Sequence, residues 1–303
     1  MYGHTEKLFI LPFDHRSSFA KGLFGTEAPD ADTVEKIKEY KQLIYEAIFV
    51  TQQELSLPLS QIAILVDETY GDDILHDARA RGIQTIQSVE KSGLDEFSFE
   101  YGEEFGSHLL DDNASFAKAL VRYNPDGDAE ANQRSLEHLR LLSFFCHNES
   151  IKLLIEVLIP PTAEQLTSVE NDKRRYDEEL RPTLTVRAIE EFQAAGIECD
   201  VWKTEGFEDA ASYQEVLAAA RNSPERADVG LVILGRGETA ERVESWITAG
   251  KNVPGILGFA VGRTVFWEPL LQYHNQEISR EEAVQKIADN FSYFAKVFLK
   301  ESE

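Results

Sequence analysis

The chain of 303 residues alternates between short apolar runs and longer stretches with helical periodicity, and this alternation restricts its fold more than any other feature. The apolar runs are nearly continuous, which is typical of strands buried on both faces of a parallel sheet. We predict eight strands, over Leu8–Phe13, Ile62–Val66, Ile83–Gln87, Ala117–Tyr123, Lys152–Leu158, Cys199–Lys203, Gly230–Leu234 and Ile256–Val261. Helical patterns cover Thr33–Gln53, Asp72–Arg81, Glu130–Asn148, Asp177–Ala195, Ala210–Ala220, Thr239–Ala249 and Arg280–Lys300.

Eight strands alternating with helices predict a (β/α)8 TIM barrel, which usually takes about 250 residues before insertions. A doubly wound open sheet is the competing fold, but no GxGxxG turn follows the first strand to favour it. No linker rich in Pro, Gly or Ser divides the chain, so we expect one domain over residues 1–303. Extra length falls at about residues 91–113, which we expect either to lie over the barrel mouth or to form a solvated loop with a short helix.

The charge balance, 30 Lys and Arg against 54 Asp and Glu, gives a formal net charge of −24 and disfavours nucleic acid as a partner. A few cations inside a cleft can still hold a small anion. Cys146 and Cys199 show no CxxC or metal-ligand spacing, which fits a cytoplasmic protein. The longest apolar runs span about ten residues, too few to cross a membrane, and we expect no signal peptide. A homo-oligomer is compatible with the sequence.

Ionisable side chains lie within or at the ends of predicted strands, and in a TIM barrel the carboxyl ends of the strands carry the chemistry. Lys203 closes the strand of DVWKTEG, where burial favours the neutral amine that attacks carbonyl groups. Lys118 lies on the fourth strand, and Glu156 interrupts the apolar run KLLIEVLIPP, where a carboxylate needs a partner or a function. Structural explanations stay open: Lys203 paired with Glu205 or Glu156, and Lys118 exposed at the start of its strand.

Glycine–arginine pairs follow the last two predicted strands. Gly235, Arg236 and Gly237 come after the seventh strand, and Gly262 and Arg263 come after the eighth. This corner of a TIM barrel often binds phosphate through backbone N–H groups and a helix N-terminus. Glycine permits close approach of the backbone, and arginine adds charge-assisted hydrogen bonds. Gly-Arg is a common dipeptide, but its occurrence at both strand ends predicts a phosphate site.

Six segments at the strand ends carry a family resemblance: FILPFDHR, KALVRYNPD, IKLLIEVLIPP, DVWKTEG, VILGRG and GFAVGRTVFW. Together they resemble the class I aldolase-like barrels, over the chain from Leu8 to about Trp267. The chain is most similar to the 2-deoxy-5-keto-gluconate 6-phosphate aldolases of myo-inositol breakdown, which also form the C-terminal half of bifunctional 5-dehydro-2-deoxygluconokinases. It is more distantly similar to the tagatose 1,6-bisphosphate aldolases.

The resemblance implies that Lys203 forms a Schiff base with a ketose phosphate, without a metal or other cofactor. Lys118 and Glu156 match the fourth-strand lysine and fifth-strand glutamate that assist in tagatose-bisphosphate aldolases, and Asp14 matches their first-strand aspartate. We expect Glu156 to transfer protons during imine formation, with Lys118 holding its charge state. Asp14 is expected to bind or deprotonate the hydroxyl at the bond that breaks.

The substrate implied by the resemblance is a phosphorylated keto sugar or sugar acid. For 2-deoxy-5-keto-gluconate 6-phosphate, cleavage would give dihydroxyacetone phosphate and malonate semialdehyde. Arg236 and Arg263 would hold the phosphate, and Arg16 or Arg122 the carboxylate. Arg122, Asn124 and the Gly-Arg-Gly turn depart from the tagatose pattern, which bears on the identity of the sugar.

Two other classes of function are compatible with these residues. A metal-dependent barrel lyase could use Asp67, Glu68 and His15 as ligands, although paired histidines near strand ends are scarce. A sugar-phosphate sensor without catalytic activity is also compatible, because a fold does not determine a function.

Overall fold

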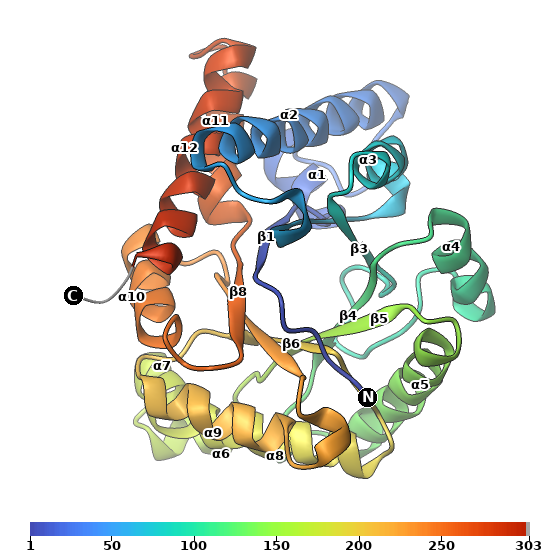
Figure 1. Ribbon diagram of the computed structural model, residues 1–303, viewed down its shortest axis with the longest axis vertical. Coiled ribbons are helices and arrows are strands. Elements are labelled where there is room, and N and C mark those ends of the chain that lie inside the picture. The colour runs from blue at the N-terminus through green and yellow to red at the C-terminus, as the bar shows by residue number, and fades with distance from the viewer. Residues whose placement is uncertain (301–303) are drawn as a thin grey trace.

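The computed structural model describes residues 1–300 and shows a closed barrel of eight parallel strands, in which β8 pairs with β1 (Figure 1). The strands are β1 (Leu8–Pro12), β2 (Ile62–Val66), β3 (Gln84–Ser88), β4 (Phe116–Arg122), β5 (Lys152–Leu158), β6 (Val201–Glu205), β7 (Gly230–Leu234) and β8 (Ile256–Ala260). The predicted TIM barrel is confirmed, and the predicted strand ends differ from the observed ones by at most two residues.

The largest difference concerns β6, which was expected to end at Lys203 and continues to Glu205. Glu205 resembles a solvated strand end in the sequence, but it is only 4% exposed because it binds Arg236. Its Oε1 lies 2.8 Å from the Arg236 Nε, and its Oε2 accepts a hydrogen bond from the backbone N–H of Ile159. Lys203 therefore occupies the middle of the strand.

Side chains alternate along the strands between the barrel interior and the surrounding helices. An apolar layer fills part of the interior: Leu8, Ile10, Ala63, Leu65, Ile86, Phe116, Leu154, Val201, Val232, Leu257 and Ala260. Lys118, Glu156 and Lys203 each follow a member of this layer by two residues. The strand period of two therefore places all three on the interior face, one layer closer to the carboxyl ends.

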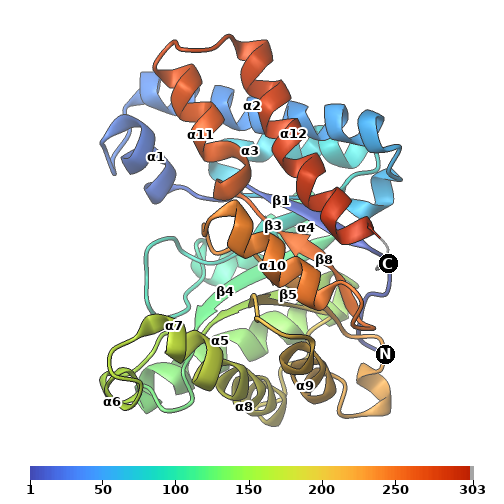
Figure 2. The same cartoon turned by 90° about the vertical axis from the view of Figure 1, so that its left-hand side faces the viewer.

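Helices surround the barrel, and the longest, α2 (Ala31–Leu55), packs side by side with α12 (Arg280–Leu299) (Figures 1 and 2). The other helices are α1 (Ser17–Phe24), α3 (Glu68–Ala80), α4 (Phe105–Asp112), α5 (Ala129–Asn148), α6 (Ala163–Ser168), α7 (Lys173–Arg175), α8 (Arg181–Ala194), α9 (Ala210–Ala220), α10 (Ala240–Gly250) and α11 (Arg263–His274). Within residues 1–300, no helix combines the length and the apolarity that a membrane span requires.

The helix predicted over Asp177–Ala195 is divided. A π-helical turn covers Tyr176–Leu180, and α8 begins at Arg181. Pro182 lies in the first turn of α8 and has no backbone N–H to donate, which interrupts the regular α-helical ladder at this point. The helices α1, α6, α7 and α11 were not predicted from the sequence; of these, α11 contains an internal proline, Pro269, that masks its helical pattern.

The segment over residues 91–113 combines both arrangements that we expected. Residues 91–97 lie at the barrel mouth and line its cavity. Phe97 and Phe99 are buried, and the ring of Phe99 stacks on that of Phe105 with their centroids 4.1 Å apart. The segment ends in the short helix α4. Its aromatic side chains thus anchor the part that covers the mouth.

Candidate active site

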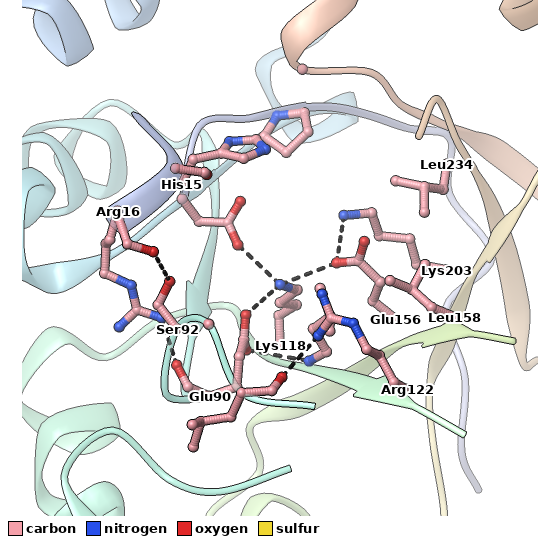
Figure 3. A pocket seen from close by; sticks show the side chains of 18 of the residues that line it. His15, Arg16, Glu90, Ser92, Lys118, Arg122, Glu156, Leu158, Lys203 and Leu234 are labelled. Atoms are coloured by element: carbon pink, nitrogen blue, oxygen red, sulfur yellow. Dashed lines mark hydrogen bonds and ion pairs between the residues drawn. The ribbon is translucent and has the colours of Figure 1, made fainter. Parts of the chain in front are cut away.

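A cavity of about 380 Å³ opens at the carboxyl ends of the strands (Figure 3). It brings together all but one of the predicted site residues: Asp14, Arg16, Lys118, Arg122, Glu156, Lys203, Arg236, Gly237, Gly262 and Arg263. Gly235 lies outside the lining. Ten of the eleven predicted site residues thus line one cavity, as the strand-end rule expects.

Lys203 and Glu156 form a buried pair at the base of this cavity. They occupy paired positions on the neighbouring strands β6 and β5. The Lys203 Nζ donates a hydrogen bond to the Glu156 Oε2 over 2.9 Å, and the two residues are 2% and 5% exposed. Of the two partners that the sequence left open for Lys203, the structure has Glu156, because Glu205 is held by Arg236.

Lys118 lies at the centre of three carboxylates (Figure 3). Its Nζ is 2.9 Å from the Asp14 Oδ2 and 3.1 Å from the Glu156 Oε2, and it donates a hydrogen bond to Glu90. The alternative of an exposed lysine is wrong, since Lys118 is 1% exposed. Burial alone would lower the pKa of Lys118, but Asp14, Glu156 and Glu90 outweigh it and raise that pKa well above its usual value. Lys118 is therefore a fixed cation.

The carboxylates around Lys118 differ in their electrostatics. Burial would raise the pKa of Glu156, but the charges of Lys118 and Lys203 outweigh burial and lower it. Burial would likewise raise the pKa of Asp14, but Lys118 and His15 hold it well below its usual range. For Glu90, burial prevails over Lys118 and raises the pKa. Asp14 and Glu156 are thus ionised at neutral pH, and Glu90 is the carboxylate most easily protonated.

Glu90 and His15 line the cavity as well, and the sequence analysis did not assign Glu90 to the site. The feature of the sequence that could have identified Glu90 is its position two residues after β3, since the other site residues also lie at strand ends. The Glu90 Oε2 accepts a hydrogen bond from the backbone N–H of Leu120 over 3.3 Å. Burial lowers the pKa of His15 to about 4, so this imidazole is neutral at neutral pH. Its Nδ1 has no hydrogen-bond partner among residues 1–300.

The glycines after β7 and β8 allow close packing of the backbone at one corner of the cavity. Gly237 has a φ of 74°, and a Cβ on it would lie 2.7 Å from the Arg263 Nη2. A Cβ on Gly262 would lie 2.3 Å from the carbonyl oxygen of Pro12. Arg263 begins α11, and the residue before it, Gly262, offers no side-chain cap. The backbone N–H groups of Val265 and Phe266 donate to the Gly262 carbonyl oxygen, which leaves those of Arg263 and Thr264 as the open donors at the start of this helix within residues 1–300.

The two arginines of this corner differ in their partners. The Arg236 Nη1 lies 2.9 Å from the Asp177 Oδ2, and its Nε binds Glu205, so two carboxylates balance its charge. Arg263 donates a hydrogen bond to the carbonyl oxygen of Arg236 over 3.3 Å and forms no ion pair within the described chain. Arg263 is thus the arginine of this pair with uncompensated charge.

Arg16 and Arg122 approach the cavity from the side of β3 and β4. The Arg16 Nη1 lies 2.8 Å from the Glu100 Oε2, and the Arg16 Nη2 donates a hydrogen bond to the carbonyl oxygen of Glu90. Arg122 donates a hydrogen bond to the carbonyl oxygen of Leu94 over 2.9 Å. Both arginines therefore also fasten the segment that follows β3.

The ligands of the alternative metal site have separate partners. Asp67 is buried in an ion pair with Lys41 and caps α3 through the N–H of Tyr70. Glu68 binds the His108 Nδ1 over 2.8 Å. Only His15 of the three lines the cavity. They do not form a shared metal site at the barrel mouth.

Comparison with known proteins shows relatives that are named aldolases. The chain is 25% identical over 284 residues to the tagatose 1,6-diphosphate aldolase of Listeria monocytogenes, which covers 88% of this chain and 79% of the relative. It is 25% identical over 288 residues to the tagatose 1,6-diphosphate aldolase 2 of Streptococcus mutans, with 88% and 82% covered. The predicted enzyme class, a carbon–carbon lyase of the aldolase type, is that of these relatives.

Solved structures confirm the fold. The fructose-bisphosphate aldolase of Plasmodium falciparum superposes with a TM-score of 0.67 at 12% identity, covering 97% of this chain and 91% of that one. The protein Cgl0159 of Corynebacterium glutamicum gives a TM-score of 0.56 at 19% identity, with 96% and 87% covered. One family spans almost the whole chain, matching residues 2–302. The chain belongs to this family, which is described as uncharacterized protein conserved in bacteria (DUF2090).

Proposed function

We propose that this protein is a class I aldolase in which Lys203 forms a Schiff base with a phosphorylated keto sugar or sugar acid. The observation that carries the proposal is the contact of 2.9 Å between the Lys203 Nζ and the Glu156 carboxylate at the base of a cavity with cationic walls. The names of the aldolase relatives support the coarser part of the proposal, the cleavage of a phosphorylated sugar.

Imine formation requires a proton acceptor beside the amine. Glu156 has a pKa below its usual value, so it is ionised and accepts the proton that Lys203 must lose. The neutral amine adds to the substrate carbonyl, and the oxygen leaves as water after protonation by Glu156, which gives the iminium ion. Lys118 keeps its charge throughout, because three carboxylates stabilise it.

The iminium ion then accepts the electron pair of the carbon–carbon bond that breaks. The hydroxyl proton on the far side of that bond goes to a carboxylate, for which Asp14 is suited because Lys118 keeps it ionised. The hydroxyl oxygen becomes the carbonyl of the released aldehyde, and the remaining fragment is an enamine on Lys203. Protonation of the enamine carbon and hydrolysis by one water molecule release the ketone and restore the lysine.

The phosphate is assigned to the corner between β7 and β8. Arg263 supplies the uncompensated charge, and the open N–H groups at the start of α11 supply further donors. Gly237 and Gly262 leave room for a close approach of the backbone to the ligand. Arg236, whose charge is balanced by Asp177 and Glu205, forms a wall of this corner.

Two substrates fit this proposal, and each has an observation in its favour. The sequence resemblance favours 2-deoxy-5-keto-gluconate 6-phosphate, whose carboxylate Arg16 or Arg122 would bind on the opposite side of the cavity. The names of the relatives favour tagatose 1,6-diphosphate, whose second phosphate would take the same place.

A substrate panel separates the two. Phosphorylated keto sugars and keto sugar acids are each incubated with the protein, and dihydroxyacetone phosphate is measured with a coupled dehydrogenase. The proposal expects turnover of at least one of them, with kcat/KM for the true substrate far above the rest. Thermal stabilisation by these phosphates with no turnover of any would contradict the proposal and support a sensor.

A further inference from the structure

The helices α3 and α4 present a row of ionisable side chains to each other, outside the cavity. Glu68, Asp72 and His76 are four residues apart on α3 and share one face, and His108 and Asp112 have the same spacing on α4. At one level of this row, Glu68 binds His108. At the next level, Asp72, His76 and Asp112 place one ligand atom each within 4.8 Å of one another.

Asp112 differs from the other buried carboxylates of residues 1–300, which are Asp67, Glu90, Glu156, Asp177, Asp200 and Glu205. Each of those six binds a lysine, an arginine or backbone N–H groups. Asp112 is only 6% exposed, yet its Oδ2 accepts no hydrogen bond from the described part of the chain. Within residues 1–300, the one basic group within 4.0 Å of its carboxylate is the His76 Nε2, at 4.0 Å from the Oδ1. A buried carboxylate in this situation lacks a cation.

We propose that Asp72, His76 and Asp112 bind a divalent transition-metal cation of the zinc type. One imidazole nitrogen and two carboxylate oxygens are zinc ligands, whereas magnesium and calcium prefer oxygen ligands alone. Water molecules complete the coordination.

The distances between the ligand atoms fit this assignment. Ligand atoms about 2.1 Å from zinc lie about 3.4 Å apart in a tetrahedral site. The Asp72 Oδ1 and the His76 Nε2 are already 3.4 Å apart. The His76 Nε2 and the Asp112 Oδ1 are 4.0 Å apart, so metal binding requires these two side chains to move closer together, and the His76 side chain is 57% exposed.

This site is separate from the proposed lyase chemistry, because none of its three residues lines the cavity. Asp112 is the last residue of α4, which closes the segment that leads from β3 across the barrel mouth. A cation shared by α3 and α4 ties the end of that segment to the barrel. It therefore acts on stability and leaves turnover unchanged.

The proposal is tested by calorimetric titration of zinc chloride into chelator-treated, dialysed protein, together with thermal unfolding. We expect one zinc ion per chain and a rise in Tm. His76→Ala and Asp72→Asn, both at exposed positions, should weaken binding by more than about 100-fold, since loss of outer-shell partners alone costs 10- to 100-fold. Asp112→Asn should abolish the zinc-dependent rise in Tm. The matched control is Asp73→Asn, which removes the same charge from an exposed neighbour on α3 and should bind zinc normally.

Three results would overturn the proposal. The first is no zinc binding by the unaltered protein at millimolar concentration. The second is equal zinc affinity in His76→Ala and Asp72→Asn, which would place the cation elsewhere. The third is a loss of zinc affinity in Asp73→Asn as large as that in Asp72→Asn, which would mean that net charge alone explains the weaker binding. Cobalt gives an independent readout, since its visible absorption should appear in the unaltered chain and disappear in His76→Ala. Aldolase turnover serves as a separate measurement that the metal result does not affect.

Discussion

Lys203 and Glu156 occupy paired positions on two neighbouring strands, with the Lys203 Nζ 2.9 Å from the Glu156 Oε2. The same carboxylate oxygen lies 3.1 Å from the Nζ of Lys118, whose charge Asp14 and Glu90 also stabilise. One lysine is thus a fixed cation held by three carboxylates, and the other has a single proton acceptor. This asymmetry is the reason that we propose Lys203, and not Lys118, for the covalent role.

Glu156→Gln should lower kcat by about 10²- to 10⁴-fold, the usual contribution of a general acid–base group. Glutamine keeps the shape of the side chain but accepts no proton from Lys203. Steady-state kinetics with the substrate found in the panel measures the effect, and circular dichroism checks the fold. A variant with normal kcat would remove Glu156 from the proton transfer.

Lys118→Met should cost about 3–5 kcal/mol of the free energy of unfolding at pH 7, because it leaves buried carboxylates without their cation. In the unaltered protein, Asp14 and Glu156 have lowered pKa values, so the stability that they contribute is present at neutral pH and is lost on acidification. In the variant, burial and mutual repulsion raise the pKa values of Asp14 and Glu90, so protonation favours the folded state.

The stability difference between Lys118→Met and the unaltered protein should therefore narrow as the pH falls from 7 towards about 4, near the unperturbed carboxyl pKa values. Denaturant unfolding at a series of pH values measures it. Lys152→Met is the matched control, because the Lys152 Nζ binds the carbonyl oxygen of Gly3 and, in the part of the chain that the structure describes, no carboxylate. A deficit in Lys118→Met that stays constant with pH would contradict the charge balance described above.

Glu90 should set the acidic limb of the pH profile of kcat/KM. Its pKa is raised by burial, so the limb should lie above the unperturbed glutamate value of about 4.3. Glu90→Gln imitates the protonated form of Glu90. Its kcat/KM should therefore be low at neutral pH, and the acidic limb of the profile should be absent. If the acidic limb stayed at the same pH in Glu90→Gln, the limb would belong to another group.

Arg263→Ala should raise KM for a phosphorylated substrate by about 10- to 150-fold, which corresponds to the loss of a charged donor worth about 1.5–3 kcal/mol. Its Tm should change little, because Arg263 forms no ion pair in residues 1–300. Arg187→Ala removes an arginine that binds Asp126 on the surface and should leave KM unchanged. An Arg263→Ala variant with normal KM and a low Tm would make Arg263 a structural residue.

The barrel could be predicted from the sequence because parallel strands buried on both faces produce continuous apolar runs between helices. Lys203, Glu156 and Lys118 could be found because charged residues within such runs are rare and costly. The ends of the strands were harder to predict from the sequence. β6 continues through Glu205 because of its ion pair with Arg236, and this partner lies on another strand end.

Other features depend on contacts between distant residues and could not be read from local patterns. In the sequence, Arg236 and Arg263 were equal candidates for binding the phosphate. In the structure, Asp177, which lies 59 residues before Arg236, balances the charge of Arg236. Glu90 follows a strand like the other site residues, but only its contact with Lys118 distinguishes it from an ordinary loop glutamate. The cluster of Asp72, His76 and Asp112 joins two helices, and no local pattern in the sequence shows that these helices pack together.

The most direct test of the central claim is to trap the Schiff base. The protein is incubated with dihydroxyacetone phosphate, reduced with borohydride, digested with trypsin and analysed by mass spectrometry. The account predicts irreversible inactivation and an adduct on Lys203, in a peptide that is no longer cleaved after this residue. Lys203→Arg should keep the fold but lose both the adduct and the activity, whereas Lys118→Ala should turn over slowly and still form the adduct. An adduct on Lys118 or Lys91, or full activity in Lys203→Arg, would contradict the account.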